Sequence, residues 1–146
     1  MPVHKPFNQG NYEANDASGK EAVTKFLVSQ GLSVKENPNR YGVDLIADGI
    51  THNGKTFNKV PIEVERRQIW NRDEFPYSTV QVAERKTKFL KDYILYAVVN
   101  KDYTKVMFCS SNVITRFMPV EVPNNSISKD EYFYNVPLEH WKVYNV

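Results

Sequence analysis

The chain has little of what several protein classes require. Its 146 residues contain one cysteine, Cys109, which excludes an internal disulfide framework and a cysteine-based zinc site. No apolar run approaches the roughly 20 residues of a membrane span, and the N-terminus lacks the basic-then-apolar layout of a signal peptide. The three histidines, His4, His52 and His140, are too scattered to predict a metal cluster. We therefore expect a soluble, cytoplasmic protein without a membrane partner.

An excess of one charge is also missing. The net charge is only +2, with 25% charged and 41% hydrophobic residues, as in an ordinary globular protein. Charge alone therefore does not indicate nucleic-acid binding, although a nearly neutral total can contain local patches. The length fits a single domain over 1–146, with a core at about 14–110 and a C-terminal extension over 111–146.

The hydrophobic pattern predicts an α/β order of elements. Ala22, Phe26 and Leu27 form the apolar stripe of a helix over 14–30, which Gly31 ends. Further elements follow at 32–35, 41–47 and 59–67 (strands), 78–91 (helix), 93–99 and 105–110 (strands), 111–116 (short helix) and 131–135 (aromatic strand). The first three strands can form an antiparallel meander, and the helix over 78–91 would cross over to place the 93–99 strand in the same sheet.

Two carboxylates stand out on the strand over 59–67. Val60, Ile62 and Val64 alternate with Pro61, Glu63 and Glu65, so the apolar set faces one side of the strand and both carboxylates face the other. The two glutamates lie about 7 Å apart along the strand and repel each other. A divalent metal ion would compensate them. The alternative is a solvated strand face paired with lysine or arginine.

Asp44 extends this acidic group. Glu63 follows it by 63 − 44 = 19 positions, so the two come side by side if their strands are antiparallel neighbours. With Glu65 they would form an oxygen-rich hollow suited to Mg²⁺ or Mn²⁺. If Asp44 and Glu63 lay more than about 8 Å apart, one ion with oxygen distances of roughly 2.3 Å could not bridge them. The carboxylates would then be surface charges on a small interaction protein.

Together these residues resemble a known family. Gly42-Val43-Asp44 on one strand and Ile62-Glu63-Val64-Glu65 on the next, in the order αβββαβ, resemble the PD-(D/E)xK nuclease superfamily. That superfamily contains restriction endonucleases, Holliday-junction resolvases and phage or repair nucleases. The resemblance covers about 16–99 and implies a restriction endonuclease-like core, a central mixed β-sheet flanked by helices.

The resemblance also implies a site. Asp44, Glu63 and the backbone carbonyl of Val64 would hold Mg²⁺, for which Mn²⁺ can substitute, and Glu21 would reach the site from the first helix. Glu65 stands where the family usually has lysine, in a Glu-x-Glu variant that some restriction enzymes share. A glutamate there can act as a general base or as a ligand of a second metal. The missing positive charge would come from Arg66, Arg67 or Lys86.

Basic and amide side chains near the motif are candidates for contacts with DNA. They are Arg66, Arg67 and Arg72 after the motif, and Gln81, Arg85 and Lys88 at helical spacing on the expected second helix. Each of these residues also has an alternative, purely structural role. The helix face can simply be solvated, and Glu21 can pair with Lys25. Trp70, Phe75 and Tyr77 can anchor their loop to the core instead of stacking on bases.

The function predicted from these residues is a Mg²⁺-dependent deoxyribonuclease, an endonuclease of the small phage, repair or restriction type. Its partner would be DNA, and a symmetric homodimer would let a chain this small cut both strands. The alternative is a catalytically inactive nuclease-fold module that binds nucleic acid or a protein partner, the site having decayed with loss of the lysine.

Overall fold

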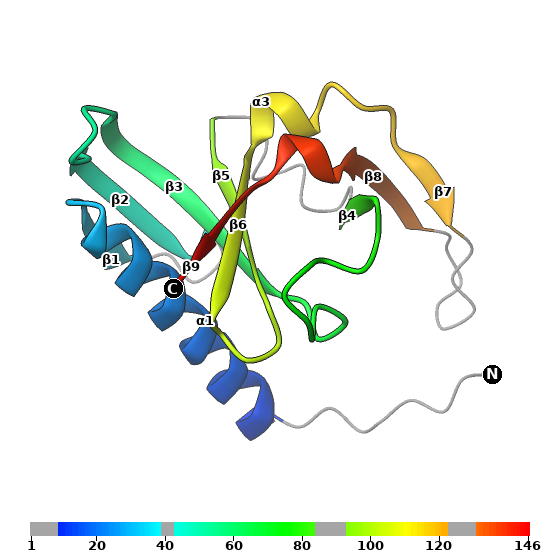
Figure 1. The fold of residues 1–146 in the computed structure, drawn as a ribbon, viewed down its shortest axis with the longest axis horizontal. Coiled ribbons are helices and arrows are strands. Elements are labelled where there is room, and N and C mark those ends of the chain that lie inside the picture. The colour runs from blue at the N-terminus through cyan, green and yellow to red at the C-terminus, as the bar shows by residue number, and fades with distance from the viewer. Residues whose placement is uncertain (1–8, 39–42, 84–92, 123–130) are drawn as a thin grey trace.

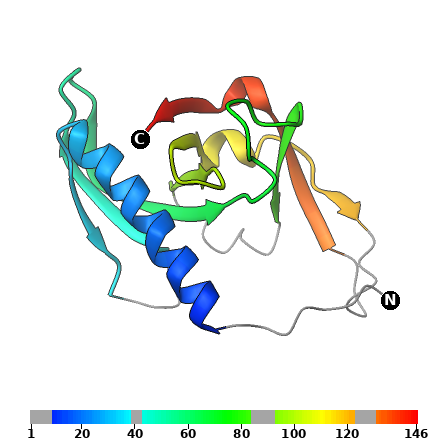
Figure 2. The same cartoon turned by 60° about the horizontal axis from the view of Figure 1, so that its bottom comes forward.

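The computed structural model describes residues 9–38, 43–83, 93–122 and 131–146 (Figure 1). One long helix, α1 (Gln9–Ser29), covers one face of a six-stranded mixed sheet, and a smaller sheet covers part of the other face (Figures 1 and 2). The α/β class expected from the sequence is therefore confirmed. No helix in the described part of the chain is long and apolar enough to cross a membrane.

The six strands of the main sheet lie in the order β1-β2-β3-β5-β6-β9. Their bounds are β1 Ser33–Glu36, β2 Leu45–Ile50, β3 Thr56–Arg66, β5 Leu95–Val99, β6 Lys105–Ser110 and β9 Lys142–Asn145. Strands β1, β2 and β3 form the expected antiparallel meander, and β5 lies beside β3 and parallel to it. Strand β9, at the far edge, was not expected.

Strand β3 is staggered between its two neighbours. It pairs with β2 over Thr56 to Ile62 and with β5 over Ile62 to Arg66, so Ile62 alone has paired residues on both sides. The first half of β3 therefore extends beyond the start of β5, and its second half extends beyond Leu45, where β2 begins. Each overhang leaves a step in the sheet, and the two steps lie at opposite ends of β3.

A β-bulge sets the side-chain pattern of β3. Between the pairs Ala47–Val60 and Gly49–Phe57, the two residues Asn58 and Lys59 face one residue of β2. Lys59 takes the left-handed conformation, with φ of 49°, that such an extra residue often needs. Because of it, Phe57 lies on the same face as Ile62.

The face of the sheet under α1 is apolar. Ala22, Val23, Phe26 and Leu27 of α1 pack on Ile62, Ala97, Val99 and Phe108 of the sheet, and all are buried. The apolar stripe expected on this helix is thus confirmed. Gly19 brings the helix close to β3, because a Cβ added there would lie 3.5 Å from Val64 Cγ1.

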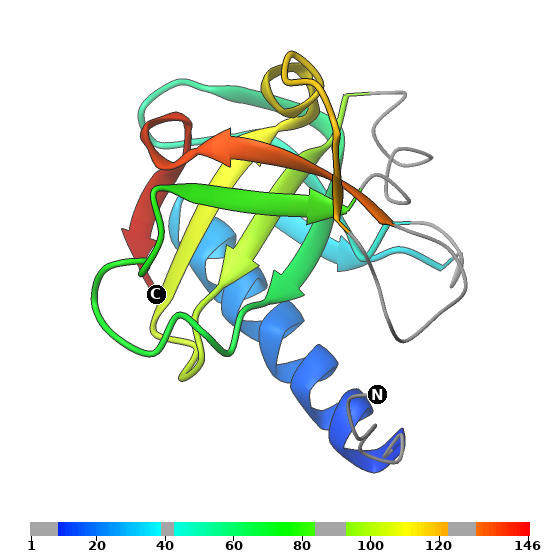
Figure 3. The same cartoon turned by 90° about the vertical axis from the view of Figure 1, so that its right-hand side faces the viewer.

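The smaller sheet covers the other face and corrects the sequence-based expectation. It has the order β4-β8-β7, with β4 Thr79–Ala83, β8 Glu131–Pro137 and β7 Val120–Val122. Its strands run across β5 and β6 (Figure 3). The helix predicted over 78–91 is wrong where it can be checked, because 79–83 is a strand. Residues 84–91 of that prediction lie outside the described residues.

The second core lies between the two sheets. Trp70, Phe75, Val80 and Val82 pack with Tyr96, Val98 and Trp141 there. Trp70 and Phe75 therefore anchor their loop to the core, which is the alternative to stacking on bases. Tyr77, in contrast, is 57% exposed. Short helices α3 (Ser111–Ile114) and η2 (Leu138–His140) close one end of this layer.

Candidate functional site

Asp44 lies where the pairing of β2 with β3 ends. It directly precedes β2, and its carbonyl accepts a hydrogen bond from Asn37 N at 3.0 Å, which continues the ladder with β1. Its carboxylate Oδ2 accepts a hydrogen bond from Val64 N at 2.8 Å. The Asp44 side chain thus takes the place on the edge of β3 that a further residue of β2 would occupy.

Glu63 is the buried member of the acidic group. The pair Leu45–Ile62 places Asp44 next to Glu63 in the antiparallel register, and the side chain of Glu63 is on the face away from α1. Only 5% of the residue is exposed, although a glutamate is almost never fully buried unless it is paired. The alternative of a solvated strand face paired with lysine or arginine is therefore wrong for Glu63, whereas Glu65, whose side chain is 35% exposed and paired with Arg67, agrees with it. A carboxylate buried in this way is stable only when charge or hydrogen bonds compensate it.

Glu65 is held by two neighbours on the same face. The Tyr96 hydroxyl on β5 donates a hydrogen bond to Glu65 Oε2, and Arg67 Nε lies 2.8 Å from Glu65 Oε1. Arg67 also donates to the carbonyl of Gln81 on β4, so the guanidinium connects the two sheets. Glu65 is therefore compensated by the protein itself and lies in a network of Tyr96, Glu65, Arg67 and the β4 backbone.

Tyr96 was not among the residues expected at the site. It is fully buried, and its pKa is raised well above 10, first because burial disfavours the phenolate and then because Glu65 lies beside it. The hydroxyl therefore stays protonated and donates. In the sequence Tyr96 is one residue of an apolar run, and only the parallel register that pairs Glu63 with Tyr96 reveals its partner.

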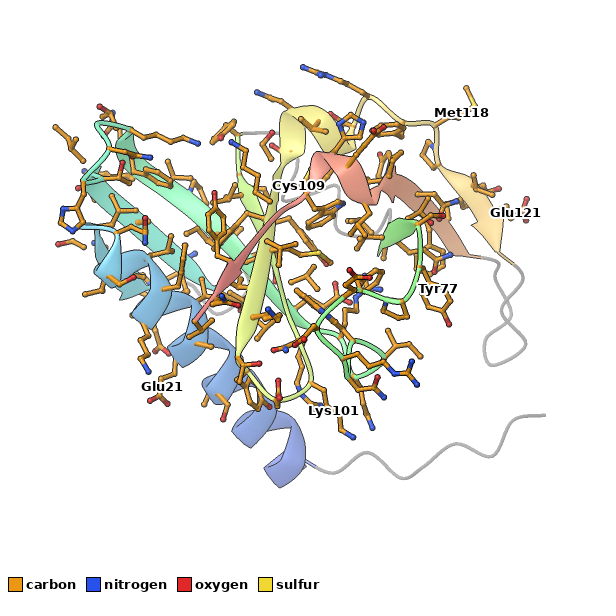
Figure 4. All side chains as sticks on the ribbon, viewed as in Figure 1. Glu21, Tyr77, Lys101, Cys109, Met118 and Glu121 are labelled. Carbon is orange, nitrogen blue, oxygen red and sulfur yellow. The ribbon has the colours of Figure 1, made fainter. Side chains whose placement is uncertain are left out.

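Lys20 is the second residue that the sequence did not reveal. It extends from α1 to within 3.9 Å of Asp44 Oδ1, with 23% of its side chain exposed. The expected helix residue, Glu21, is instead exposed, and Figure 4 shows it on the side of α1 away from the sheet. Helical spacing alone places neighbours 20 and 21 about 100° apart, so the crossing of α1 over β3 decides which one reaches Asp44.

The remaining candidates are dispersed. Arg66 lies on the face opposite Glu65, where it donates to the Lys101 carbonyl at 2.9 and 3.1 Å and stacks over Tyr103. Arg72 is exposed in the loop after β3. Gln81 is an exposed residue of a strand, so its assignment to a helix face is wrong. The candidates Lys86, Arg85 and Lys88 lie outside the described residues.

The donor set can be compared with what a metal ion needs. Among the residues that the structure describes, no three His, Cys, Asp or Glu side chains converge as ligands. Asp44 and Glu63 remain as a pair, and the Val64 carbonyl lies on the same edge of β3 as its N–H, which faces Asp44. Mg²⁺ is commonly bound through one or two carboxylates while keeping several waters. Asp44, Glu63 and the Val64 carbonyl are oxygen donors of the type that Mg²⁺ takes, whereas Glu65 is already held by Tyr96 and Arg67.

Comparisons with protein-family models, with curated proteins and with solved structures found no match for this chain. Its site is therefore interpreted from the residues and their geometry.

Proposed function

We propose that the protein is a Mg²⁺-dependent deoxyribonuclease with a restriction endonuclease-like core of the PD-(D/E)xK type, and that it hydrolyses phosphodiester bonds. The supporting observation is the position of Asp44, whose carboxylate takes a hydrogen bond from Val64 N at 2.8 Å and lies next to buried Glu63. This pair matches the two acidic positions of the motif to which the chain is similar.

In this proposal each residue near the pair has a separate role. Asp44, Glu63 and the Val64 carbonyl hold the metal, which supplies Lewis-acid stabilisation of charge on the phosphate. Lys20, 3.9 Å from Asp44, brings the positive charge that the missing motif lysine would bring. Glu65 is a positioning residue: Tyr96 and Arg67 fix it, and its remaining lone pairs can orient a water.

A second function is favoured by the contacts of Glu65. Arg67 and Tyr96 already compensate the carboxylate at the motif's third position, although 35% of the Glu65 side chain is exposed. A catalytically inactive module that binds nucleic acid or a protein partner would have the same contacts. Metal binding that depends on Asp44 separates the two functions, since an inactive module has no need to keep it.

Replacing Glu63 by glutamine tests the proposal. We expect the wild type to cleave at least one of plasmid, linear duplex, single-stranded, branched or mismatched DNA with Mg²⁺ or Mn²⁺. Glu63→Gln should lower that cleavage more than about 100-fold, because even outer-shell changes at metal sites cost 10- to 100-fold. Glu36→Gln, at an exposed position of β1, is the matched control and should cleave like the wild type.

Calorimetric titration with Mg²⁺ and Mn²⁺ completes the test. Binding by the wild type that is lost in Asp44→Asn supports the nuclease. Absence of Asp44-dependent metal binding, together with DNA binding but no cleavage on any substrate, supports the inactive module. Cleavage by Glu63→Gln at the wild-type rate would overturn the proposed site.

A further inference from the structure

A pocket of about 270 Å³ lies on the α1 face of the main sheet, at the step where β3 extends beyond the start of β5. Its walls come from the C-terminal part of α1, the β2–β3 hairpin, and the adjoining ends of β5, β6 and β9. Phe57 lines it, six residues before Glu63 on β3, so the two positions are about 20 Å apart along the strand and on opposite faces. The pocket is therefore separate from Asp44 and Glu63.

Aromatic rings form one wall of the pocket. Tyr144 lies with its ring centroid 4.8 Å from that of Phe26 and 6.1 Å from that of Phe108, and the Phe26 and Phe108 centroids are 5.7 Å apart. All three residues line the pocket, and Tyr144 is 39% exposed. Such a wall favours a flat, unsaturated ligand, since nucleic-acid bases stack on aromatic side chains.

The charged residues that line the pocket are lysines. Lys55 and Lys142 line it, and none of the described aspartates or glutamates does, although Glu139 Oε1 lies 3.8 Å from Nε2 of the lining residue His140. Within the described part of the chain neither lysine forms an ion pair, while Lys55 lies 5.7 Å over the Phe57 ring. Burial raises the pKa of the lining Cys109 to about 12, so its thiol adds no negative charge at neutral pH. The lining therefore attracts an anion.

Amide groups supply hydrogen bonds at the rim. Gln30, from the end of α1, and Asn53, from the hairpin, both line the pocket, and Asn53 Oδ1 already accepts a hydrogen bond from the Thr51 hydroxyl. Each amide offers donors and an acceptor, the combination that recognises the edge of a nucleobase. A ring wall, an amide rim and two lysines thus match three parts of one ligand: a flat ring, its hydrogen-bonding edge and an anionic group.

We propose that this pocket binds a nucleoside 5′-monophosphate, with the base against Phe26, Phe108 and Tyr144 and the phosphate beside Lys55 and Lys142. The volume of about 270 Å³ is close to the lower end of the range found for small-ligand pockets. The proposal does not rest on the nuclease function, because none of the lining residues belongs to the Asp44–Glu63 pair.

Calorimetry with the purified full chain, in EDTA to exclude metal, tests the pocket. The probes are adenosine, guanosine, cytidine and uridine 5′-monophosphates, the matching nucleosides, and inorganic phosphate. We expect at least one monophosphate to bind, and to bind more than tenfold tighter than its nucleoside or phosphate alone. Lys55→Gln and Lys142→Gln should each weaken binding about tenfold, as loss of a charge-assisted contact does.

Lys101→Gln is the matched control, since it removes the same charge from an exposed position at the opposite end of β5 and β6 from Cys109 (Figure 4). It should bind like the wild type, as should Asp44→Asn. In amide NMR spectra the signals of Phe57 and Lys142 should shift on titration, and that of Glu63 should not. No binding at millimolar monophosphate, equal binding of nucleoside or phosphate alone, or unchanged affinity in Lys142→Gln would overturn the proposal.

Discussion

The two faces of strands β3 and β5 differ in polarity. Under α1, Ile62, Ala97 and Val99 belong to a cluster of buried apolar side chains. One residue along, on the other face, Glu63 is buried, and Tyr96 is buried in the core beneath the smaller sheet. Since β-strand side chains alternate, a single stretch of chain builds both environments.

This difference shows where polar groups can be buried in a small protein interior. A buried carboxylate costs stability unless charge or hydrogen bonds compensate it. On the polar face the compensation comes from far along the chain: Tyr96 donates to Glu65, and Arg67 reaches the Gln81 carbonyl of the smaller sheet. The apolar cluster under α1 contains no charge that needs such partners. We therefore expect substitutions on the two faces to act through different physical terms.

The largest effect on stability is expected on the apolar face. Ile62 is fully buried between α1 and the sheet, so Ile62→Ala should leave a cavity and lower the free energy of unfolding by about 2–5 kcal/mol. Urea denaturation measures the change. Val28→Ala, at a position of α1 that is 53% exposed, is the control and should change stability by less than about 0.5 kcal/mol. Equal effects of the two changes would contradict the packing described for α1.

A smaller effect is expected on the polar face. Tyr96→Phe keeps the ring but removes the hydroxyl that donates to Glu65, and should cost about 1–3 kcal/mol at pH 7. Tyr77→Phe, where the side chain is exposed, is the matched control and should be within about 0.5 kcal/mol of the wild type. A neutral Tyr96→Phe would show that Glu65 does not depend on this hydrogen bond.

The same pair of variants has a signature in alkaline solution. Burial and Glu65 raise the pKa of Tyr96 well above 10, so the folded protein keeps a proton that the unfolded chain releases above about pH 10. The stability from this group is complete below pH 10 and is lost as pH rises further. The free energy of unfolding should fall by up to about 1.4 kcal/mol per pH unit more in the wild type than in Tyr96→Phe. Tyr77→Phe should keep the wild-type slope.

The smallest effect is expected outside both faces. Glu21 is exposed on the side of α1 away from the sheet, so Glu21→Ala should change the free energy of unfolding by less than about 0.5 kcal/mol. Calorimetric Mg²⁺ binding and DNA cleavage should match the wild type. A tenfold loss in either would place Glu21 at the site, as the resemblance to the nuclease superfamily implies.

Elements with a strong local pattern could be predicted from the sequence. The apolar stripe of α1 consists of Ala22, Phe26 and Leu27, and the alternating residues of β3 are Val60, Ile62 and Val64. Both sets pack in the core under α1, as their spacing predicts. The strand β4 was missed although Val80 and Val82 have strand spacing, because Ala83 beside Val82 also fits a helix and the resemblance favoured one. Here the packing of the two valines on the second core decides the conformation.

The candidate site was predictable where it depends on neighbouring strands. Asp44 and Glu63 could be placed together, since an antiparallel meander brings consecutive strands side by side. The partners of Glu65 could not be predicted in this way. Tyr96 follows Glu65 by 31 positions and lies beside it only because β5 pairs with β3 in parallel. The approach of Lys20 to Asp44 depends on the angle at which α1 crosses the sheet, and no local sequence pattern predicts that angle. Arg85 and Lys88 stay predictions.

The stagger of β3 has a consequence for how this protein could be redesigned. The Asp44 contact with the β3 edge and the pocket at Phe57 both exist because β2 and β5 overlap on β3 at Ile62 alone. Adding residues to the start of β5 would extend its ladder along the hairpin and fill the pocket. Moving the start of β2 to before Asp44 would replace its carboxylate on the edge of β3 with backbone. Changing the length of β2 would thus remove the Asp44 contact, and changing the length of β5 would remove the pocket, without replacing a side chain in either site.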